Sequence, residues 1–293
     1  MQYVSELVLP PRGAAEGALA EAKNNRTCYQ NVYPFGVFDG WEEERLPLAP
    51  LTVFYGGNGS GKTTLLNLLG EKLELERRSL YNRSHFFACY AELCQCRLTG
   101  KRWHEGRVLT SDDVFDDLLD QRSLNQGIDL ERDDLLAEYK QLREEQGFQL
   151  RSLEDYETLK KVILAKRRRG SGSDYVRRTL GQEFRGKSNG ETALRYFTNQ
   201  IQDNGLYLLD EPENSLSVQY QRELAGFLAD SVRFFSCQVI LSTHSPFLLA
   251  MPGAVVYDLD QRPIQAAVWT ALPAVRAYYE FFKEHAAELD SAE

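Results

Sequence analysis

The chain has 293 residues and a formal net charge of −9, with 34 Lys and Arg residues against 43 Asp and Glu residues. This length suits one large domain or two small ones, and 43% hydrophobic with 26% charged residues is typical of folded globular proteins. The negative charge excludes a uniformly basic nucleic-acid-binding protein. No run approaches the ~18 consecutive apolar residues of a membrane-spanning helix, and the N-terminus lacks a signal-peptide pattern, so we expect a cytoplasmic protein.

Five cysteines are spread over the chain, at positions 28, 89, 94, 96 and 237. Cys94 and Cys96 are separated by one residue, whereas the cysteine pairs of zinc sites usually have two or more between them. We therefore expect reduced and mostly buried thiols rather than a zinc site.

Residues 1–55 alternate short apolar runs with Pro and Gly, which predicts a β-rich N-terminal part. The expected strands are YVSELVLP, NVYPFGVFDGW and PLTVFYG. From Thr63 the leucines take the spacing of a helix. The aromatic run SHFFACYAEL that follows is predicted as a buried strand, with a helix as the alternative.

Residues 97–187 are predicted to form a mostly helical lobe. Ser111 and Ser152 each stand before an acidic first turn, which is typical of helix N-termini. The lobe is divided in charge, because residues 105–145 hold 13 acidic and 5 basic residues, whereas residues 151–187 hold 11 basic and 5 acidic residues. The basic run at 166–169 is interpreted as a solvated helix end, and the alternative is a loop that contacts phosphates.

After Gly190, helices and strands alternate up to residue 260. The expected helices are ETALRYFTNQI and VQYQRELAGFLADSV, and the expected strands are GLYLLD, CQVILST and AVVYDL. Such alternation predicts an α/β fold whose parallel sheet is covered on both faces. Residues 270–290 are predicted to form an amphipathic helix that packs on the body, with Val275, Tyr278, Tyr279 and Phe282 on one side.

Residues 56–63 read GGNGSGKT and fit the P-loop (Walker A) pattern G-x-x-x-x-G-K-[ST]. The motif follows the apolar run LTVFY and opens the helix TTLLNLL, which is the context it requires. In such a loop backbone N–H groups wrap a phosphate, Lys62 reaches the β- and γ-phosphates, and the Thr63 hydroxyl binds Mg²⁺. The predicted ATP-binding residues are Gly56, Gly57, Asn58, Gly59, Ser60, Gly61, Lys62, Thr63 and Thr64.

The run Gly205-Leu206-Tyr207-Leu208-Leu209-Asp210-Glu211 is an apolar strand with two carboxylates at its C-terminal end. In a P-loop protein this is the Walker B position. Because adjacent strand residues face opposite ways, Asp210 is expected to hold Mg²⁺, while Glu211 at the turn polarises a water molecule. His244 ends the strand CQVILST, which we expect beside the Walker B strand, and a neutral imidazole there can hydrogen-bond a γ-phosphate or its water.

Three runs in a fixed order complete the pattern, namely Ser188-Asn189-Gly190-Glu191 before a helix, LLDEPENSLS after it, and STHSPFLL beyond. Over residues 30–260 the chain resembles the ATP-binding-cassette (ABC) ATPases, and among them the SMC, RecF and OLD-like branch of AAA family ATPases. The resemblance implies an α/β P-loop NTPase fold of the ABC type over residues 1–293. It places the nucleotide-binding core in 56–96 and 188–260 and implies a homodimer formed head to tail around two ATP molecules.

The resemblance also assigns roles to single residues. Ser188, Gly190 and Glu191 would contact the ATP held by the opposite subunit, and His244 would be the switch histidine that senses its γ-phosphate. The chain differs from many members at Ser217, where they carry Asp at the end of the loop after Walker B.

Two further sites are open within this resemblance. For the glutamine loop, Gln95 is the candidate contact to Mg²⁺ and water, and Tyr90 and Glu92 are alternatives. For stacking on adenine, Tyr33, Phe35 and Phe38 lie upstream in a suitable zone, but core packing explains these aromatics equally well.

We therefore expect a Mg-ATP-dependent ATPase with Lys62, Glu211 and His244 as its catalytic residues. Its cycle is expected to act on DNA or to regulate a separate nuclease-like or toxin-like effector, since too few residues remain after Asp260 for a nuclease domain. DNA contact rests on the basic residues Arg151–Lys187. The alternative is the nucleotide-binding subunit of an ABC membrane transporter.

Overall fold

The computed structural model describes residues 1–25, 28–41, 45–144, 161, 176 and 189–291. The chain divides into two compact units. The first contains Met1–Phe115 and Ser188–Glu293, and the second contains Asp116–Lys187. The predicted residues Ser152, Lys166–Arg169 and Ser188 lie outside the described residues.

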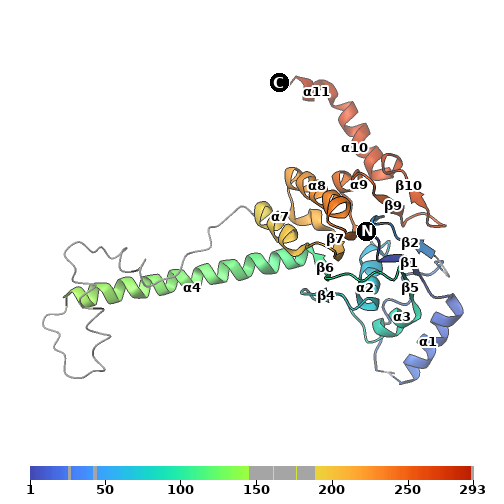
Figure 1. The fold of residues 1–293 in the computed structure, drawn as a ribbon, viewed down its shortest axis with the longest axis horizontal. Coiled ribbons are helices and arrows are strands. Elements are labelled where there is room, and N and C mark those ends of the chain that lie inside the picture. Colours follow the sequence, from blue (N-terminus) through green and yellow to red (C-terminus); the bar gives the residue numbers. More distant parts are fainter. Residues whose placement is uncertain (26–27, 42–44, 145–160, 162–175, 177–188, 292–293) are drawn as a thin grey trace. The chain divides into compact units, whose positions relative to one another are not determined.

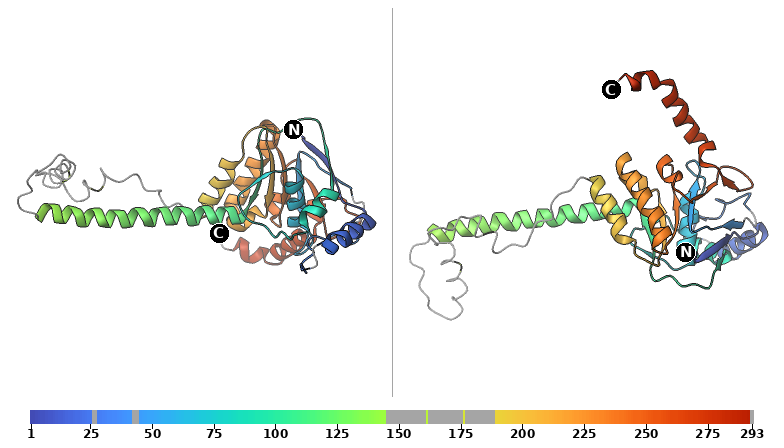
Figure 2. Two further views of the ribbon diagram at one scale, coloured as in Figure 1. Left: turned by 90° about the horizontal axis from the view of Figure 1, so that it is seen from below. Right: turned by 45° about the horizontal axis from the view of Figure 1, so that its top comes forward.

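A seven-stranded sheet forms the centre of the first unit (Figures 1 and 2). The strand order is β10-β9-β3-β8-β7-β6-β4. All neighbours pair in parallel except β10, which is antiparallel to β9. The strands are β3 (Leu51–Tyr55), β4 (Glu76–Arg77), β6 (Gly106–Thr110), β7 (Leu206–Asp210), β8 (Gln238–Ser242), β9 (Val255–Asp258) and β10 (Ala266–Ala267). The predicted α/β fold with a mostly parallel sheet is confirmed.

Helices cover this sheet because its strands are apolar on both faces. Leu206 and Leu208 of β7 belong to a buried cluster with the leucines of α2 (Lys62–Lys72). Tyr207 and Leu209, which alternate with them, point to the other face and are fully buried as well. The helices α7 (Asn189–Gln200) and α8 (Val218–Phe234) contact each other, and α8 contacts β8.

The N-terminal part is less β-rich than predicted. A three-stranded antiparallel sheet has the order β2-β1-β5, with β1 (Val4–Val8), β2 (Arg45–Pro47) and β5 (Gln95–Leu98). Between β1 and β2 lies the helix α1 (Arg12–Asn25), which the sequence analysis missed although five of its fourteen residues are alanine. The run expected as the strand NVYPFGVFDGW forms turns instead, because Gly36 and Gly40 have φ values of +90° and +86°.

Two further predictions need correction between α2 and the second unit. The run SHFFACYAEL contains the helix α3 (Phe87–Leu93), so the alternative reading was correct. The helical lobe does not begin at residue 97, because β5 ends at Leu98 and β6 occupies Gly106–Thr110. Helix α4 (Ser111–Glu144) begins only after β6.

The first turn of α4 is capped one residue earlier than predicted. Thr110 accepts a hydrogen bond from the Asp113 backbone N–H at 3.3 Å, and Asp113 accepts one from the Thr110 N–H at 2.7 Å. This reciprocal pair is a capping box. In the second unit, Lys161 pairs with Glu138 of α4 at 2.7 Å.

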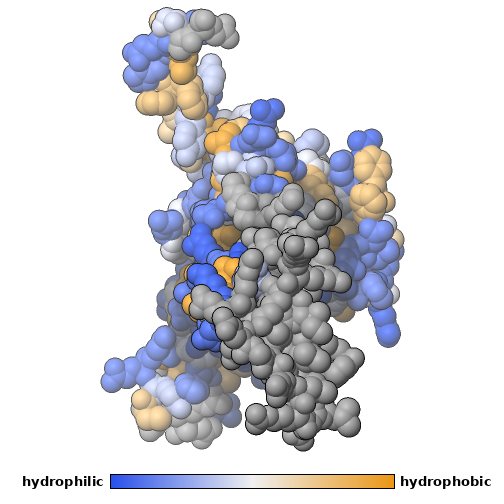
Figure 3. Space-filling view, turned by 90° about the vertical axis from the view of Figure 1, so that its left-hand side faces the viewer, coloured by the Kyte–Doolittle hydropathy of each residue, from blue (hydrophilic) through white to orange (hydrophobic). Residues whose placement is uncertain are grey.

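The C-terminal helices differ from the prediction in their packing. The helices α10 (Pro273–Glu284) and α11 (Ala286–Asp290) are present, but neither contains a buried residue. Tyr278, Tyr279, Phe281 and Phe282 of α10 are 50–55% exposed, and orange side chains are visible at the surface of this segment, at the top of the space-filling view (Figure 3). The helix is therefore not packed on the body as expected.

Among the described helices, none combines the length and apolar composition that a bilayer-spanning segment requires. The thiols are free, with Cys94 and Cys237 buried, Cys89 and Cys96 half-buried and Cys28 exposed. Burial raises the pKa of Cys94 to about 12 and that of Cys96 to about 11. Across the part of the chain that the structure describes, no cluster of three or more His, Cys, Asp or Glu residues is arranged to hold a metal ion.

Candidate nucleotide-binding site

The loop between β3 and α2 contains the glycine-rich motif, and its backbone requires glycine at two points. Gly61 immediately precedes α2 with φ +94°, a region that other residues rarely adopt, and a Cβ there would lie 3.0 Å from the Phe38 ring. A Cβ on Gly56 would lie 2.6 Å from the Ser60 hydroxyl oxygen. The sequence therefore folds this segment into a tight loop at a helix N-terminus, which is the place where proteins bind phosphate.

Lys62 extends back across this loop although it is 5% exposed. Its ammonium group donates hydrogen bonds to the carbonyl oxygens of Gly56 at 2.9 Å and Gly57 at 3.1 Å. The same Nζ atom lies 3.6 Å from Glu211 Oε1. The buried ammonium group of Lys62 is thus held by the loop carbonyls and lies close to the Glu211 carboxylate.

Asp210 ends β7 and connects the start of α2 to the neighbouring strand β8. Its Oδ1 atom accepts hydrogen bonds from the Thr63 hydroxyl at 3.0 Å and from the Ser242 hydroxyl at 2.5 Å. Burial raises the pKa of the Asp210 carboxyl; the hydrogen bonds from Ser242 and Thr63 lower it, and the charge of Glu211 raises it further.

Glu211 follows Asp210 in a left-handed backbone conformation, with φ +44° and ψ +54°. Its N–H donates to the Ser242 hydroxyl at 3.0 Å, and its Oε2 atom accepts a hydrogen bond from the Asn214 amide at 3.1 Å. Such a conformation costs about 1 kcal/mol or more for a residue with a side chain. It turns the Glu211 carboxylate away from the strand direction and toward Lys62 and His244.

His244 lies in the loop between β8 and the short helix α9 (Pro246–Leu249). Its Nε2 atom is 3.5 Å from Glu211 Oε1 and is buried without a hydrogen-bond partner. Burial lowers the pKa of the His244 imidazole, and the Lys62 cation lowers it further, whereas Glu211 and Asp260 raise it. The net effect is a lowered pKa, which favours the neutral form of the ring. The expectation that β8 lies beside the Walker B strand is confirmed by their parallel pairing.

The structure thus brings together three segments that lie far apart in the sequence, with the residues Lys62 and Thr63, Asp210 and Glu211, and His244. The Ser60 hydroxyl is a buried oxygen without a partner, and the Thr64 hydroxyl accepts a hydrogen bond from Tyr33 at 2.9 Å.

The signature segment is only partly described. Gly190 and Glu191 lie in the first turn of α7, and a Cβ on Gly190 would lie 2.8 Å from the Tyr220 ring of α8. Ser217 is exposed and directly precedes α8.

Gln95 was predicted to contact Mg²⁺ and water, and that role stays a prediction. Gln95 lies in β5 opposite Val8, in the antiparallel sheet and not in the sheet that carries Asp210. On the side away from β8, β7 pairs with β6, whose last residue, Thr110, is a partner of Asp210. The strand β6, which was not expected from the sequence, lies between Gln95 and the helix α4 in the chain.

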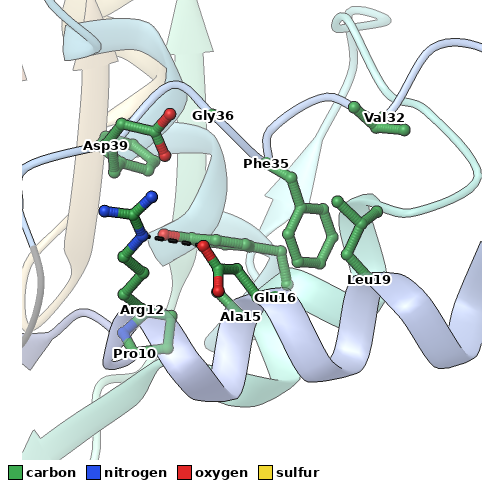
Figure 4. Close-up of a pocket in the computed structure, with 11 residues that line it drawn as sticks. Pro10, Arg12, Ala15, Glu16, Leu19, Val32, Phe35, Gly36 and Asp39 are labelled. Atoms are coloured by element: carbon green, nitrogen blue, oxygen red, sulfur yellow. Dashed lines mark hydrogen bonds and ion pairs between the residues drawn. The ribbon is translucent and has the colours of Figure 1, made fainter.

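The upstream aromatics are explained by core packing. Phe35 and Phe38 are buried and pack against Tyr90 and Trp41 with ring centroids 5.0–5.9 Å apart. Phe35 and Phe38 also line a pocket of about 260 Å³ beside α1, in which the Arg12 guanidinium lies between Glu16 and Asp39 (Figure 4). Tyr33 is half-buried and supports α2 through Thr64.

Four polar residues of the site were not found from the sequence. They are Ser242, Glu213, Asn214 and Asp260, whose carboxylate accepts a hydrogen bond of 2.6 Å from the Gly57 N–H. A signal existed only for Ser242, since a polar residue that ends a strand beside Walker B must lie next to Asp210 at the sheet edge. The other three depend on turns that the sequence does not specify.

The residues present fit a nucleoside triphosphate with Mg²⁺. The glycine loop leaves no room for side chains at Gly56 and Gly61, and two polar atoms at the site, Ser60 Oγ and His244 Nε2, are buried without partners. The Thr63 hydroxyl and the Asp210 carboxylate are hard oxygen ligands of the kind that Mg²⁺ prefers. Beside His244 and Glu213 a groove of about 930 Å³ opens toward α10, lined by Trp269, Tyr278, Tyr279 and Phe282 among others.

Comparisons with known proteins give a family and a set of weak structural similarities. A family model described as "AAA domain, putative AbiEii toxin, Type IV TA system" matches residues 94–250. No curated protein matches the chain.

Among solved structures, the chain is similar to an Smc head domain with an extended coiled coil bound to the C-terminal domain of ScpA, from Pyrococcus furiosus. The two sequences are 12% identical, the match covers 97% of this chain and 99% of that one, and the TM-score is 0.44. An SMC head domain from Thermotoga maritima is 12% identical over 87% of this chain and 94% of that one, with a TM-score of 0.36. A dimeric bacterial ABC transporter cassette is 15% identical over 77% of this chain and 89% of that one, with a TM-score of 0.34.

Proposed function

The chain belongs to the family described as "AAA domain, putative AbiEii toxin, Type IV TA system", an ABC-type P-loop ATPase family of the SMC/RecF-like branch, and we propose that it hydrolyses ATP with Mg²⁺. The observation that carries the proposal is the convergence of Lys62 and His244 on Glu211 Oε1, at 3.6 Å and 3.5 Å. A buried cation, a carboxylate and a neutral imidazole at one point beside a glycine loop are suited to phosphoryl transfer to water.

In this mechanism Glu211 polarises the attacking water, and Lys62 neutralises the charge that develops on the transferred phosphoryl group. His244 offers its unpartnered Nε2 atom to the γ-phosphate or to the water. Thr63 and Asp210 would hold Mg²⁺, which neutralises charge on phosphate oxygens when bound. The loop residues 56–64 bind the phosphates through their N–H groups.

We further propose that two copies assemble head to tail around two ATP molecules. In that dimer Ser188, Gly190 and Glu191 would contact the ATP of the opposite subunit. The N-terminus of α7, where Gly190 and Glu191 lie, carries partial positive charge and N–H groups that suit a γ-phosphate.

The biological output that we propose is regulation of an effector protein or action on DNA. The name of the family, which mentions a toxin of a type IV toxin–antitoxin system, favours the first of these. DNA contact would use the basic segment 151–187, of which Lys161 alone among the basic residues is described. We place the protein in the cytoplasm, where Mg-ATP is supplied and thiols such as Cys94 stay reduced.

The variant Glu211→Gln tests the proposal. It keeps the Walker A loop, so it should bind ATP with the affinity of the wild type, while ATP turnover falls by a factor on the order of 10² or more. Light scattering should show that it accumulates as a dimer with saturating Mg-ATP. Turnover equal to the wild type would overturn the role of Glu211, and a monomer under these conditions would overturn the dimer.

The same variant, held in Mg-ATP, can identify the partner. Recovery of a soluble nuclease-like or toxin-like protein would support effector regulation, and recovery of DNA would support action on DNA. Recovery of a membrane permease would instead favour the nucleotide-binding subunit of a transporter.

A further inference from the structure

The turn after the Walker B strand contains a second glutamate whose side chain is directed to another part of the site. Residues Pro212–Ser215 form a short 3₁₀ turn, and Pro212 at its start is buried. Within the turn Asn214 hydrogen-bonds the Glu211 carboxylate at 3.1 Å. Glu213 instead hydrogen-bonds the His244 loop, so side chains of this one turn contact both Glu211 and the His244 loop.

The Glu213 carboxylate holds the loop that carries His244. Its Oε1 atom accepts a hydrogen bond of 2.5 Å from the His244 backbone N–H, and the Thr243 hydroxyl hydrogen-bonds the same carboxylate. Thr243 is fully buried, and its Oγ1 atom in turn accepts a hydrogen bond of 2.9 Å from the Ser245 N–H. Three consecutive residues of the loop are thus fixed, directly or through Thr243, by Glu213.

The position of the His244 ring depends on this backbone. Its Nε2 atom, 3.5 Å from Glu211 Oε1, has no hydrogen-bond partner. The other recorded ring neighbour is Tyr55, edge to face at a centroid distance of 6.3 Å. Because no hydrogen bond holds the ring nitrogen Nε2, we expect the backbone that Glu213 holds to direct the ring toward Glu211.

We propose that Glu213 is a positioning residue, whose carboxylate fixes the His244 loop so that the imidazole faces Glu211. This inference rests on the ATPase function proposed above. It adds a direct connection between the turn after Walker B and the histidine that senses the γ-phosphate. A movement of that turn is then transmitted to the His244 loop through the hydrogen bonds that the Glu213 carboxylate makes with His244 and Thr243.

The burial of Glu213 is consistent with this role. Burial raises the pKa of its carboxyl, whereas the hydrogen bonds from His244 and Thr243 lower it, and its Oε2 atom is buried without a partner. Removing a carboxylate from water costs free energy unless every oxygen is hydrogen-bonded. An apolar residue at 213 would avoid this cost but would leave the His244 N–H without an acceptor.

Three substitutions at this position separate the hydrogen bond from the charge. Glu213→Ala removes the acceptor, and kcat should fall by about ten- to hundredfold, the effect of a misplaced group, with KM for ATP unchanged within about twofold because the glycine loop is untouched. Glu213→Gln keeps an acceptor oxygen at the same reach and should recover kcat to within about threefold of the wild type. Glu213→Asp keeps the charge but is one methylene shorter, and should resemble Glu213→Ala. Glu223→Ala, at an exposed position of α8, is the matched control and should leave kcat unchanged.

A double-mutant cycle with His244→Ala shows whether Glu213 acts through the histidine. In the His244→Ala background, Glu213→Ala should lower kcat by less than about twofold, since the group that it positions is already gone. An equal loss of kcat with and without His244 would overturn the proposal. Wild-type activity in Glu213→Asp together with a loss in Glu213→Gln would also overturn it, because the charge would then be what matters.

A measurement without turnover keeps this inference distinct from the ATPase proposal. In an NMR titration, the pKa of His244 should not rise in Glu213→Gln, which keeps the ring in place. In Glu213→Asp it should rise toward the ordinary value, because the ring leaves its buried position. If the wild type fails to hydrolyse ATP but this shift is seen, the ATPase proposal fails and the positioning contact stands. If the wild type hydrolyses ATP and neither kcat nor the pKa changes in Glu213→Asp, the positioning role alone fails.

Discussion

The Thr63 hydroxyl donates a hydrogen bond of 3.0 Å to the Asp210 carboxylate across 147 positions of sequence. Ser242 donates to the same oxygen at 2.5 Å, and in the sheet Asp210 lies between its partners Thr110 and Ser242. The carboxylate is therefore surrounded by hydroxyl groups at the carboxyl edge of the parallel sheet. Burial disfavours the ionised form of this carboxylate, and a bound cation would stabilise it.

The first prediction is that Asp210→Asn stabilises the protein in the absence of nucleotide. Burial raises the pKa of Asp210 in the folded state, so stability is lost as pH rises from the ordinary Asp range through this raised pKa. At pH 7 the ionised carboxylate is a cost that Asn removes, while the Asn oxygen still accepts from Thr63 and Ser242. We expect a gain of about 1 kcal/mol, or roughly 2–4 °C in Tm, in thermal denaturation at pH 7.

The control for this prediction is Asp230→Asn, at an exposed position of α8, which should leave Tm unchanged. With Mg-ATP added, the order should reverse, because the wild type gains stability from binding and the Asn variant loses its Mg²⁺ ligand. A lower Tm of Asp210→Asn at pH 7 without nucleotide would contradict the prediction.

The second prediction concerns Gly61. In Gly61→Ala the new Cβ would lie 3.0 Å from the Phe38 ring at a backbone φ of +94°, so the loop must distort. We expect a loss of about 1–2 kcal/mol in the free energy of unfolding and at least a tenfold weaker binding of ATP, measured by denaturation and calorimetry. Gly226→Ala in α8 is the matched control, because nothing lies within 4 Å of its new Cβ. It should stabilise by about 0.5–1 kcal/mol with ATP binding unchanged.

The phosphate site was predictable from sequence because its geometry is local. A strand, six loop residues and a helix fix Lys62 and Thr63, and the Walker B carboxylates need only a strand end nearby. The same holds for His244, since β8 pairs with β7. What the sequence could not show was the left-handed conformation of Glu211, which turns its carboxylate toward Lys62.

The errors occur at short strands and turns, because a short strand, a turn and the start of a helix can have similar amino-acid compositions. The strand β6, five residues long, was interpreted as part of a helical lobe. The turns at 31–41 have the aromatic residues of a strand, but Phe35, Phe38 and Trp41 are spaced by three and all are buried. That spacing brings them to one side of a turn segment, whereas a strand would alternate with a period of two.

The third prediction is a depressed pKa for His244. Burial and the Lys62 cation lower it, whereas the Asp260 carboxylate raises it, so Asp260→Asn should lower it further. An NMR titration of the four histidines, with His244→Gln to assign the signal, measures both values. The control Glu288→Gln removes the carboxylate 3.2 Å from His285 and should leave the His244 titration unchanged. A His244 pKa at or above the ordinary 6.5 would contradict the prediction.

The fourth prediction compares two phenylalanines of opposite exposure. Phe197 in α7 is fully buried, and Phe197→Ala should cost about 3–5 kcal/mol in the free energy of unfolding, since it loses apolar contacts and leaves a cavity. Phe282 in α10 is 55% exposed, and Phe282→Ala should cost less than about 1 kcal/mol. Urea denaturation at a single protein concentration measures both. A cost for Phe282→Ala close to that for Phe197→Ala would mean that α10 packs on the body, as the sequence pattern alone predicts.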